Sequence, residues 1–394
     1  MEQFAAILIR STFSFLVLSL ILIASIQAED VEGEAVAAGD VRPHLEYLAS
    51  PDRRGRDTWG KQESRDYILA RFQEYGLQPL FPEDSWWQWL PNRDPDDGSD
   101  NYEGQNLGGF VQGTDPQLRQ EWIVVNAHYD HLGVIRGRIY PGADDNASGV
   151  SMLLEVAERI AKSPLRRSVA FVSFDREEEL LWGSRWFVAH SPIPLDQIKL
   201  CVTADMIGRS LGGLQSQTVF IMGAEHSHAV RHAIDHVPLP DKLELAPLGT
   251  DYVGPRSDYA PFRDERIPFL FYSTGETPDY HTPRDTLDKI DFDKTARIST
   301  HILRTIQTLG DSEEDIHWRP AEYHNLEEAQ AVHRVVSTLL NADDGGRYAL
   351  SNSQRFFVSQ IFAKTKYMLS VERVTDEERS WLKRATQILM FTTF

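Results

Sequence analysis

The sequence of 394 residues contains a single cysteine, Cys201. It therefore forms no intrachain disulfide, and cysteine-based zinc sites and iron–sulfur clusters are excluded. Positive charge is also scarce, because 40 Lys and Arg stand against 59 Asp and Glu, for a net charge of −19. Since nucleic-acid phosphates repel a chain of this charge, we expect no nucleic-acid partner. Any metal must be held by His, Asp and Glu.

Long hydrophobic runs are absent apart from residues 12–24, which follow Arg10 near the N-terminus. This run is too short for a comfortable membrane span and is typical of a secretory signal. The small residue Ala28 precedes two acidic residues, so we expect cleavage after Ala28. We therefore predict that residues 1–28 are a signal peptide and that the mature protein is exported to the periplasm or the extracellular space, without stable membrane insertion. An uncleaved anchor is the alternative.

Residues 121–309 alternate short apolar, β-branched runs with amphipathic stretches, which indicates a sheet flanked by helices. The five predicted strands are residues 122–127, 169–174, 200–204, 219–222 and 267–272. Because these runs are apolar on both faces, the strands are expected to be buried and largely parallel. We predict an α/β fold, a three-layer sandwich with a mostly parallel or mixed central sheet, over residues 29–318. Residues 319–394 are predicted to form a helical C-terminal extension.

Acids and histidines follow the predicted strands, at the edge where open α/β sheets bind ligands. The groups are His128, Asp130 and His131; Asp144 and Asp145; Asp175, Glu177, Glu178 and Glu179; Asp205; and Asp279, His281 and Asp285. Carboxylates crowded at one edge repel one another by about 1 kcal/mol or more for each close pair unless a cation neutralises them. The sequence therefore predicts a divalent metal site.

The mixture of donors indicates which metal is bound. Imidazoles among carboxylates suit zinc or its first-row neighbours, whereas magnesium and calcium prefer oxygen alone. Two histidines and at least three carboxylates suffice for two ions, and a carboxylate that bridges two ions about 4 Å apart is typical of metal-assisted hydrolysis. We therefore expect two Zn²⁺ ions, with other first-row divalent metals as the alternative.

These motifs, in this order, resemble the co-catalytic di-zinc aminopeptidases. This family of zinc exopeptidases includes aminopeptidase Y and bacterial leucyl aminopeptidases and, more distantly, glutaminyl cyclase. The resemblance covers residues 106–290, with weaker similarity at residues 47–56 and 75–79. It implies a metallopeptidase that removes N-terminal residues from peptide substrates.

The resemblance also implies the metal ligands. Asp145, Glu178 and His281 match the ligands of one zinc, and His128, Asp145 and Asp205 match those of the other, so that Asp145 is shared. Asp145 is preferred to its neighbour Asp144 because the family's bridging aspartate lies four residues before the last glycine of this motif.

Three further residues are implied to act in catalysis. Asp130 matches the acid that orients the imidazole of His128. Glu177 matches the general base that takes a proton from the attacking water and returns it to the leaving amine. Tyr280 matches a tyrosine that steadies the tetrahedral intermediate. Tyr259 departs from the family pattern, which has a histidine at this position.

Several alternatives to an aminopeptidase stay open. Activity like that of a glutaminyl cyclase or a carboxypeptidase is compatible with the same fold. A serine hydrolase is disfavoured. A non-catalytic metal-binding homologue is also disfavoured, because every ligand position and the position of the base are filled. The oligomeric state is left open.

Overall fold

The computed structural model describes residues 35–92 and 102–393. The predicted signal peptide, residues 1–28, lies outside the described residues. Residues 37–394 form one compact unit, which carries all the features described below. Within the described ranges, every helix is too short or too polar to cross a membrane.

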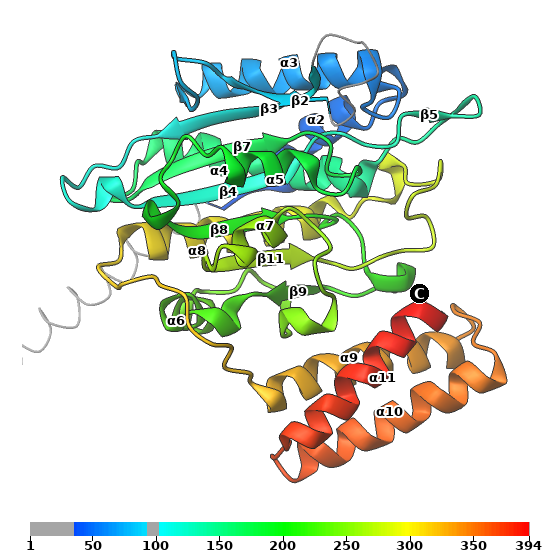
Figure 1. The fold of residues 1–394 in the computed structure, drawn as a ribbon. Helices are drawn as coiled ribbons and strands as arrows, with labels where there is room; N and C mark the ends of the chain where they lie inside the picture. The colour runs from blue at the N-terminus through cyan, green and yellow to red at the C-terminus, as the bar shows by residue number, and fades with distance from the viewer. Residues whose placement is uncertain (1–34, 93–101, 394) are drawn as a thin grey trace, which may run out of the picture. The chain divides into compact units, whose positions relative to one another are not determined.

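The core of this unit is a mixed sheet, built by nine strands of the described residues in the order β1-β3-β7-β4-β8-β11-β9-β10, with β2 paired to β3 (Figure 1). The strands are β1 (Gln78–Pro79), β2 (Trp87–Pro91), β3 (Tyr102–Val111), β4 (Trp122–His128), β7 (Ser168–Phe174), β8 (Ile198–Ala204), β9 (Thr218–Met222), β10 (Glu244–Pro247) and β11 (Phe269–Ser273). Two short strands, β5 (Val134–Ile135) and β6 (Arg138–Ile139), form a separate hairpin.

The strands that precede the candidate ligands run in the same direction. β4 is parallel to β7 and to β8, and β8 is parallel to β11. Their carboxyl ends therefore meet at one edge of the sheet. β3 runs antiparallel to β7, and β9 runs antiparallel to β11, so the sheet is mixed. The predicted α/β fold with a mostly parallel or mixed sheet is confirmed.

Helices cover both faces of the sheet. The helices of the described residues are α2 (Ala38–Leu48), α3 (Thr58–Glu74), α4 (Gly149–Lys162), α5 (Trp182–Ala189), α6 (His228–His236), α7 (Tyr259–Asp264), α8 (Phe292–Asp311), α9 (Asn325–Asp344), α10 (Asn352–Ser370) and α11 (Asp376–Thr393), of which the last three form a group of their own. α4 packs on β4, β7 and β8 and contacts α2 and α8, whereas α5 and α7 cover the other face.

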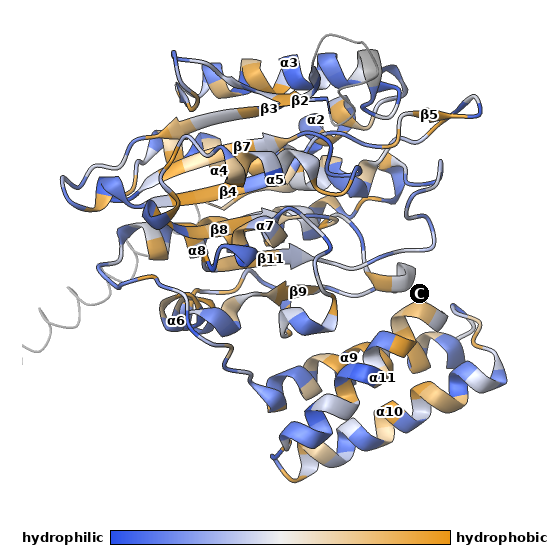
Figure 2. Cartoon of the chain, in the orientation of Figure 1, coloured by the Kyte–Doolittle hydropathy of each residue, from blue (hydrophilic) through white to orange (hydrophobic). Residues whose placement is uncertain are grey.

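Burial of apolar side chains explains these layers. Figure 2 shows that β4 and β8 consist mostly of hydrophobic residues. On the face covered by α5 and α7, Phe174, Phe187 and Phe262 are fully buried and their rings contact one another. The apolar stripe of α4, which includes Leu153 and Leu154, is buried against the opposite face. The sheet is thus fixed from both sides.

Helices α9, α10 and α11 form the C-terminal extension and share a core of their own. Val336, Leu339, Val358, Ile361 and Leu382 are fully buried in it. α9 packs along β10, at the edge of the sheet. The sequence predicted a helical C-terminal extension, and the three helices confirm it.

Candidate metal centre

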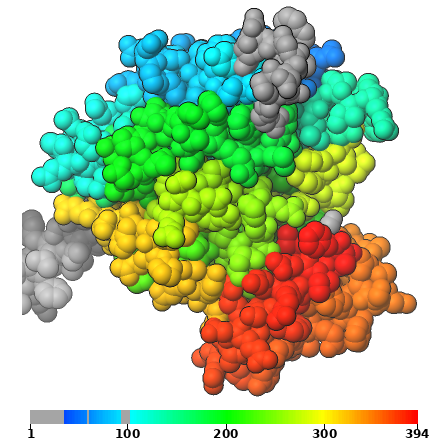
Figure 3. Space-filling model, viewed as in Figure 1, coloured from blue at the N-terminus to red at the C-terminus, as the bar shows by residue number. Residues whose placement is uncertain are grey.

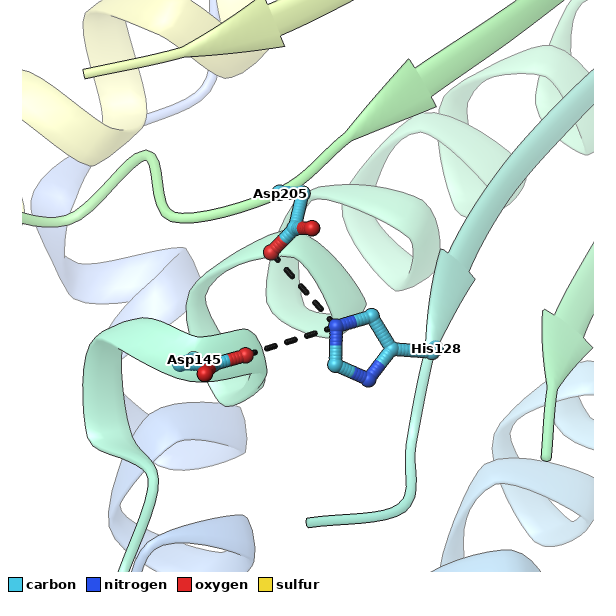
Figure 4. A group of neighbouring side chains, drawn as sticks. All are labelled: His128, Asp145 and Asp205. Carbon is cyan, nitrogen blue, oxygen red and sulfur yellow. Dashed lines mark ion pairs between the residues drawn. The ribbon is translucent and has the colours of Figure 1, made fainter. Parts of the chain in front are cut away.

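Three candidate ligands converge where β4 and β8 end. His128 is the last residue of β4, Asp205 directly follows β8, and Asp145 lies in the helical turn that precedes α4. Figure 4 shows the two carboxylates pointing at the imidazole of His128. His128 Nε2 lies 3.4 Å from Asp145 Oδ1 and 3.5 Å from Asp205 Oδ1. All three side chains are buried, and their donor atoms are close enough to hold one metal ion.

A second group forms around the other carboxylate oxygen of Asp145. His281 Nε2 lies 3.1 Å from Asp145 Oδ2 and 3.0 Å from Glu178 Oε2. His131, to which the resemblance gave no role, also belongs to this group, since its Nδ1 lies 2.7 Å from Glu178 Oε1 and 3.7 Å from Asp145 Oδ2. His131, Asp145 and Glu178 can themselves surround an ion. Asp145 is therefore common to both groups.

The unsatisfied atoms of the first group fit a metal ion. His128 Nε2 and Asp205 Oδ1 are buried, and neither has a hydrogen-bond partner among the described residues. Leaving buried polar atoms unpaired costs about 1–3 kcal/mol each, so such atoms call for an explanation. The other ring nitrogen, His128 Nδ1, faces the backbone oxygen of Asp130 at 3.3 Å, as is usual for a metal-ligating histidine. A nitrogen and two carboxylate oxygens are a donor set that zinc accepts.

Asp130 connects the two loops that carry the histidine and the glutamates. Its Oδ1 lies 3.6 Å from His128 Nδ1. The same carboxylate accepts hydrogen bonds from the backbone N–H groups of Glu177, at 3.2 Å, and Glu178, at 3.4 Å. Glu177 Oε2 comes within 3.9 Å of His128 Nε2, so Glu177 faces the first group. Asp130 thus fixes both the imidazole and the paired glutamates.

The buried charges of the cluster act strongly on one another. Burial raises the pKa of Glu177 well above its ordinary value, and Asp205 and Asp258 raise it further, although His128 opposes them. Burial opposes protonation of His128, but Glu177 and Asp205 outweigh it and raise the pKa of His128. Burial also raises the pKa of Asp258, to about 7. A cation bound here would change all these ionisations together.

Two residues outside the implied ligand set hold the ligand loops in place. Arg56 is fully buried. Its guanidinium donates to five backbone carbonyl oxygens at 2.6–3.2 Å, those of Leu48, Tyr129, Pro141, Gly142 and Asp145. Asp285 accepts hydrogen bonds from the backbone N–H groups of Asp144 and Asp145, at 3.1 Å. The sequence alone assigned no role to Arg56. The available signal was its position at the end of residues 47–56, where the chain weakly resembles the family.

Two of the residues discussed above lie away from the two donor groups. Asp144 Oδ1 accepts a 2.7 Å hydrogen bond from the backbone N–H of Gly208 and does not face His128. Tyr259, at the family's histidine position, is buried with its ring stacked on Phe269 at 4.9 Å, and its hydroxyl donates to the carbonyl of Gly254. Tyr259 is therefore a core residue.

Tyr280 adjoins the second group, with its ring stacked on that of His281 at a centroid distance of 3.8 Å. Burial raises the pKa of the Tyr280 hydroxyl, and the negative charge of Asp145 raises it further. Tyr280 therefore stays protonated at neutral pH and can donate a hydrogen bond.

A serine-hydrolase motif, Gly-x-Ser-x-Gly, does occur at Gly208–Gly212. Its serine, Ser210, donates to the carbonyl of Ser216 at 2.8 Å and accepts a 2.9 Å hydrogen bond from Lys294 Nζ. Catalytic serines instead bond to a histidine. Ser210 is therefore a structural residue that anchors Lys294.

Known proteins are similar to this chain in sequence. Aminopeptidase YwaD of Bacillus subtilis is 28% identical over 183 residues, which are 43% of this chain and 36% of that protein. The match covers a smaller share of two larger relatives: 23% of endoplasmic reticulum metallopeptidase 1 of rat and 21% of that of mouse. The chain thus spans well under half the length of these relatives.

Solved structures agree with this. The LapA aminopeptidase of Legionella pneumophila superposes with a TM-score of 0.56 at 22% identity, covering 73% of this chain and 76% of that one. A glutaminyl cyclase of Porphyromonas gingivalis superposes with a TM-score of 0.55 at 18% identity, covering 69% and 98%. At these identities the likeness establishes the fold alone. The model of peptidase family M28 matches residues 106–306, about half of the chain, and the chain therefore belongs to peptidase family M28.

Proposed function

We propose that this chain is an exported di-zinc aminopeptidase. The observation that carries the proposal is the pair of buried donor groups that share Asp145, beside which Glu177 lies. A carboxylate common to two such groups suits two ions held close together, which is the arrangement used in metal-assisted hydrolysis. Export is proposed from the apolar run at residues 12–24.

The proposed ligands are those that the motifs imply. His128, Asp145 and Asp205 would hold one ion, and Asp145, Glu178 and His281 the other, with His131 bound to Glu178. When bound, such ions are Lewis acids that polarise a carbonyl group and make water a better nucleophile. The protein's own contribution is to keep His128, Asp145 and Asp205 buried and to hold Glu178 and the partly exposed His281 beside them.

Glu177 is proposed to move the proton. Its carboxylate lines the same cavity as Asp145 and Asp205 and is not needed as a ligand. In this place it takes a proton from the attacking water and returns it to the amine that leaves the scissile bond. Tyr280, which lines the same cavity, would donate its hydroxyl hydrogen to the oxygen on which negative charge develops.

The test compares two neighbouring glutamates. We expect Glu177→Gln to keep two zinc ions per chain and the folded state but to lose about 10²- to 10⁴-fold in kcat, because the general base is missing. Glu179→Gln is the matched control, since Glu179 is paired with Arg176 and its side chain is 38% exposed. Metal content is measured by mass spectrometry, and turnover is measured on aminoacyl-anilides.

Three results would contradict the proposal. Undiminished turnover of Glu177→Gln would remove this residue from the mechanism. Cleavage of amino-blocked peptides only would indicate a carboxypeptidase. Cyclisation of an N-terminal glutamine without peptide hydrolysis would indicate a glutaminyl cyclase.

A further inference from the structure

A largely apolar cavity of ≈ 120 Å³ adjoins the candidate metal centre. Asp145, Glu177 and Asp205 line it where it meets the donor groups. Its other charged lining residues among those described, Arg256 and Glu276, form an ion pair of 2.7 Å. Because these two charges neutralise each other, the remainder of the cavity suits an uncharged group.

The C-terminal extension supplies one wall of this cavity. Val332 and Val335 of α9 and Leu389 and Met390 of α11 line it, opposite Phe220 and other side chains of the sheet. The extension lies outside residues 106–306, the part of the chain that the family model matches. This wall therefore lies outside the matched family region.

One buried and one partly exposed ion pair hold the wall in place. Arg379 of α11 binds both carboxylate oxygens of Asp251, at 2.8 and 3.0 Å, and both of Glu328, at 2.6 and 2.9 Å. Asp251 lies in the 3₁₀ turn Thr250–Tyr252, between β10 and α7. In Figure 3 the red α11 lies directly against the yellow-green segment of the catalytic unit.

We propose that α9 and α11 form one wall of the pocket that receives the side chain of the substrate's N-terminal residue, and that this wall, through Val335 and Met390, sets the largest side chain that the pocket accepts. The inference rests on the proposed function, because ions held by Asp145 and Asp205 would bind the scissile carbonyl near these residues. The side chain of the same residue lies within a few bonds of that carbonyl and so reaches the cavity.

The size and the lining of the cavity indicate which side chains it accepts. An apolar cavity of about 150 Å³ is known to hold benzene, so ≈ 120 Å³ suits an aliphatic side chain of leucine size. Three of the chain's six methionines, Met206, Met222 and Met390, line the cavity. Because methionine side chains adapt their shape, the pocket can also enlarge for an aromatic ring.

The test fills the pocket from the extension and measures kcat/KM on alanyl- and leucyl-anilides. We expect the unchanged chain to cleave the leucyl substrate at least about tenfold better. Met390→Trp should lower kcat/KM for the leucyl substrate about tenfold or more and leave the alanyl substrate within about threefold, mainly through KM. Ile388→Trp is the matched control, since Ile388 is half-exposed on the same helix and does not line the cavity, and it should change neither value.

A second variant covers the case in which Met390→Trp does not fold. Val335→Ala removes two methyl groups from the wall on α9 and should raise kcat/KM for a phenylalanyl substrate relative to leucyl by about threefold or more. Equal rates on alanyl and leucyl substrates, or equal losses on both in Met390→Trp, would overturn this inference alone. Absence of any aminoacyl-anilide cleavage by the unchanged chain would overturn the proposed function and the inference with it.

Discussion

The position of the C-terminal extension depends on the ion cluster around Arg379, and this dependence is open to measurement. The side chain of Arg379 is 7% exposed and that of Glu328 3%. Arg379→Met leaves Glu328 with the backbone N–H of Gly249, at 2.9 Å, and the Tyr252 hydroxyl, at 3.2 Å, but with no cation. Removing one partner of a buried ion pair costs about 3–5 kcal/mol. We expect a loss of this size in the free energy of unfolding.

The assay is a double-mutant cycle in urea, followed by circular dichroism and by hydrogen exchange of the α11 amides. Arg379→Met combined with Glu328→Gln should recover at least about 2 kcal/mol relative to the sum of the single variants, because the stranded charge is gone. Lys383→Met is the control, since Lys383 contacts Asp251 at 2.7 Å but both side chains are nearly 30% exposed, and it should cost less than about 1 kcal/mol. A cost below about 1 kcal/mol for Arg379→Met, or additive single variants, would refute the reasoning.

Three further outcomes are expected. Arg56→Lys offers three donors to five carbonyl oxygens, so at least two of these oxygens lose their partner. We expect the free energy of unfolding to fall by about 2 kcal/mol or more, and zinc binding, measured by chelator competition, to weaken about 10- to 100-fold. Unchanged zinc binding would show that Arg56 does not hold the ligand loops. Burial lowers the pKa of His301 to about 4, so the unfolded chain binds the extra proton between pH 6.5 and 4. Stability should therefore be full above pH 6.5 and fall by about 1.4 kcal/mol per pH unit through this window, and His301→Gln should lose that slope in pH-dependent urea unfolding. His281→Ala should retain about one zinc per chain and His131→Gln two, and the reverse order would make His131 the ligand.

The centre of the fold could be predicted because its residues carry their own signal. The strands around Val125, Phe171 and Val202 are apolar on both faces, which only a doubly covered sheet requires. Once such strands are parallel, the residues that follow them must gather at one edge. The grouping of His128, Asp145 and Asp205 therefore follows from local pattern and topology together.

Other parts depend on contacts between distant residues and leave no local signal. The strand β3 contains three glycines and alternates poorly, so its place at the sheet is decided by pairing with β7. The role of Arg56 depends on carbonyl groups up to 89 residues away. The surface that α11 presents to the cavity depends on where Arg379 binds, 128 positions after Asp251.

The sheet-edge loops and the helices of the extension form different sides of the pocket, and this has an evolutionary consequence. The candidate metal donors are held by main-chain groups of the sheet-edge loops, whereas part of the facing wall comes from helices outside residues 106–306, the region that the family model matches. Under the proposed function, substitutions on those helices can change which N-terminal residue is accepted without altering the candidate metal donors. Acquisition or loss of such an extension would then change the substrate specificity of related enzymes.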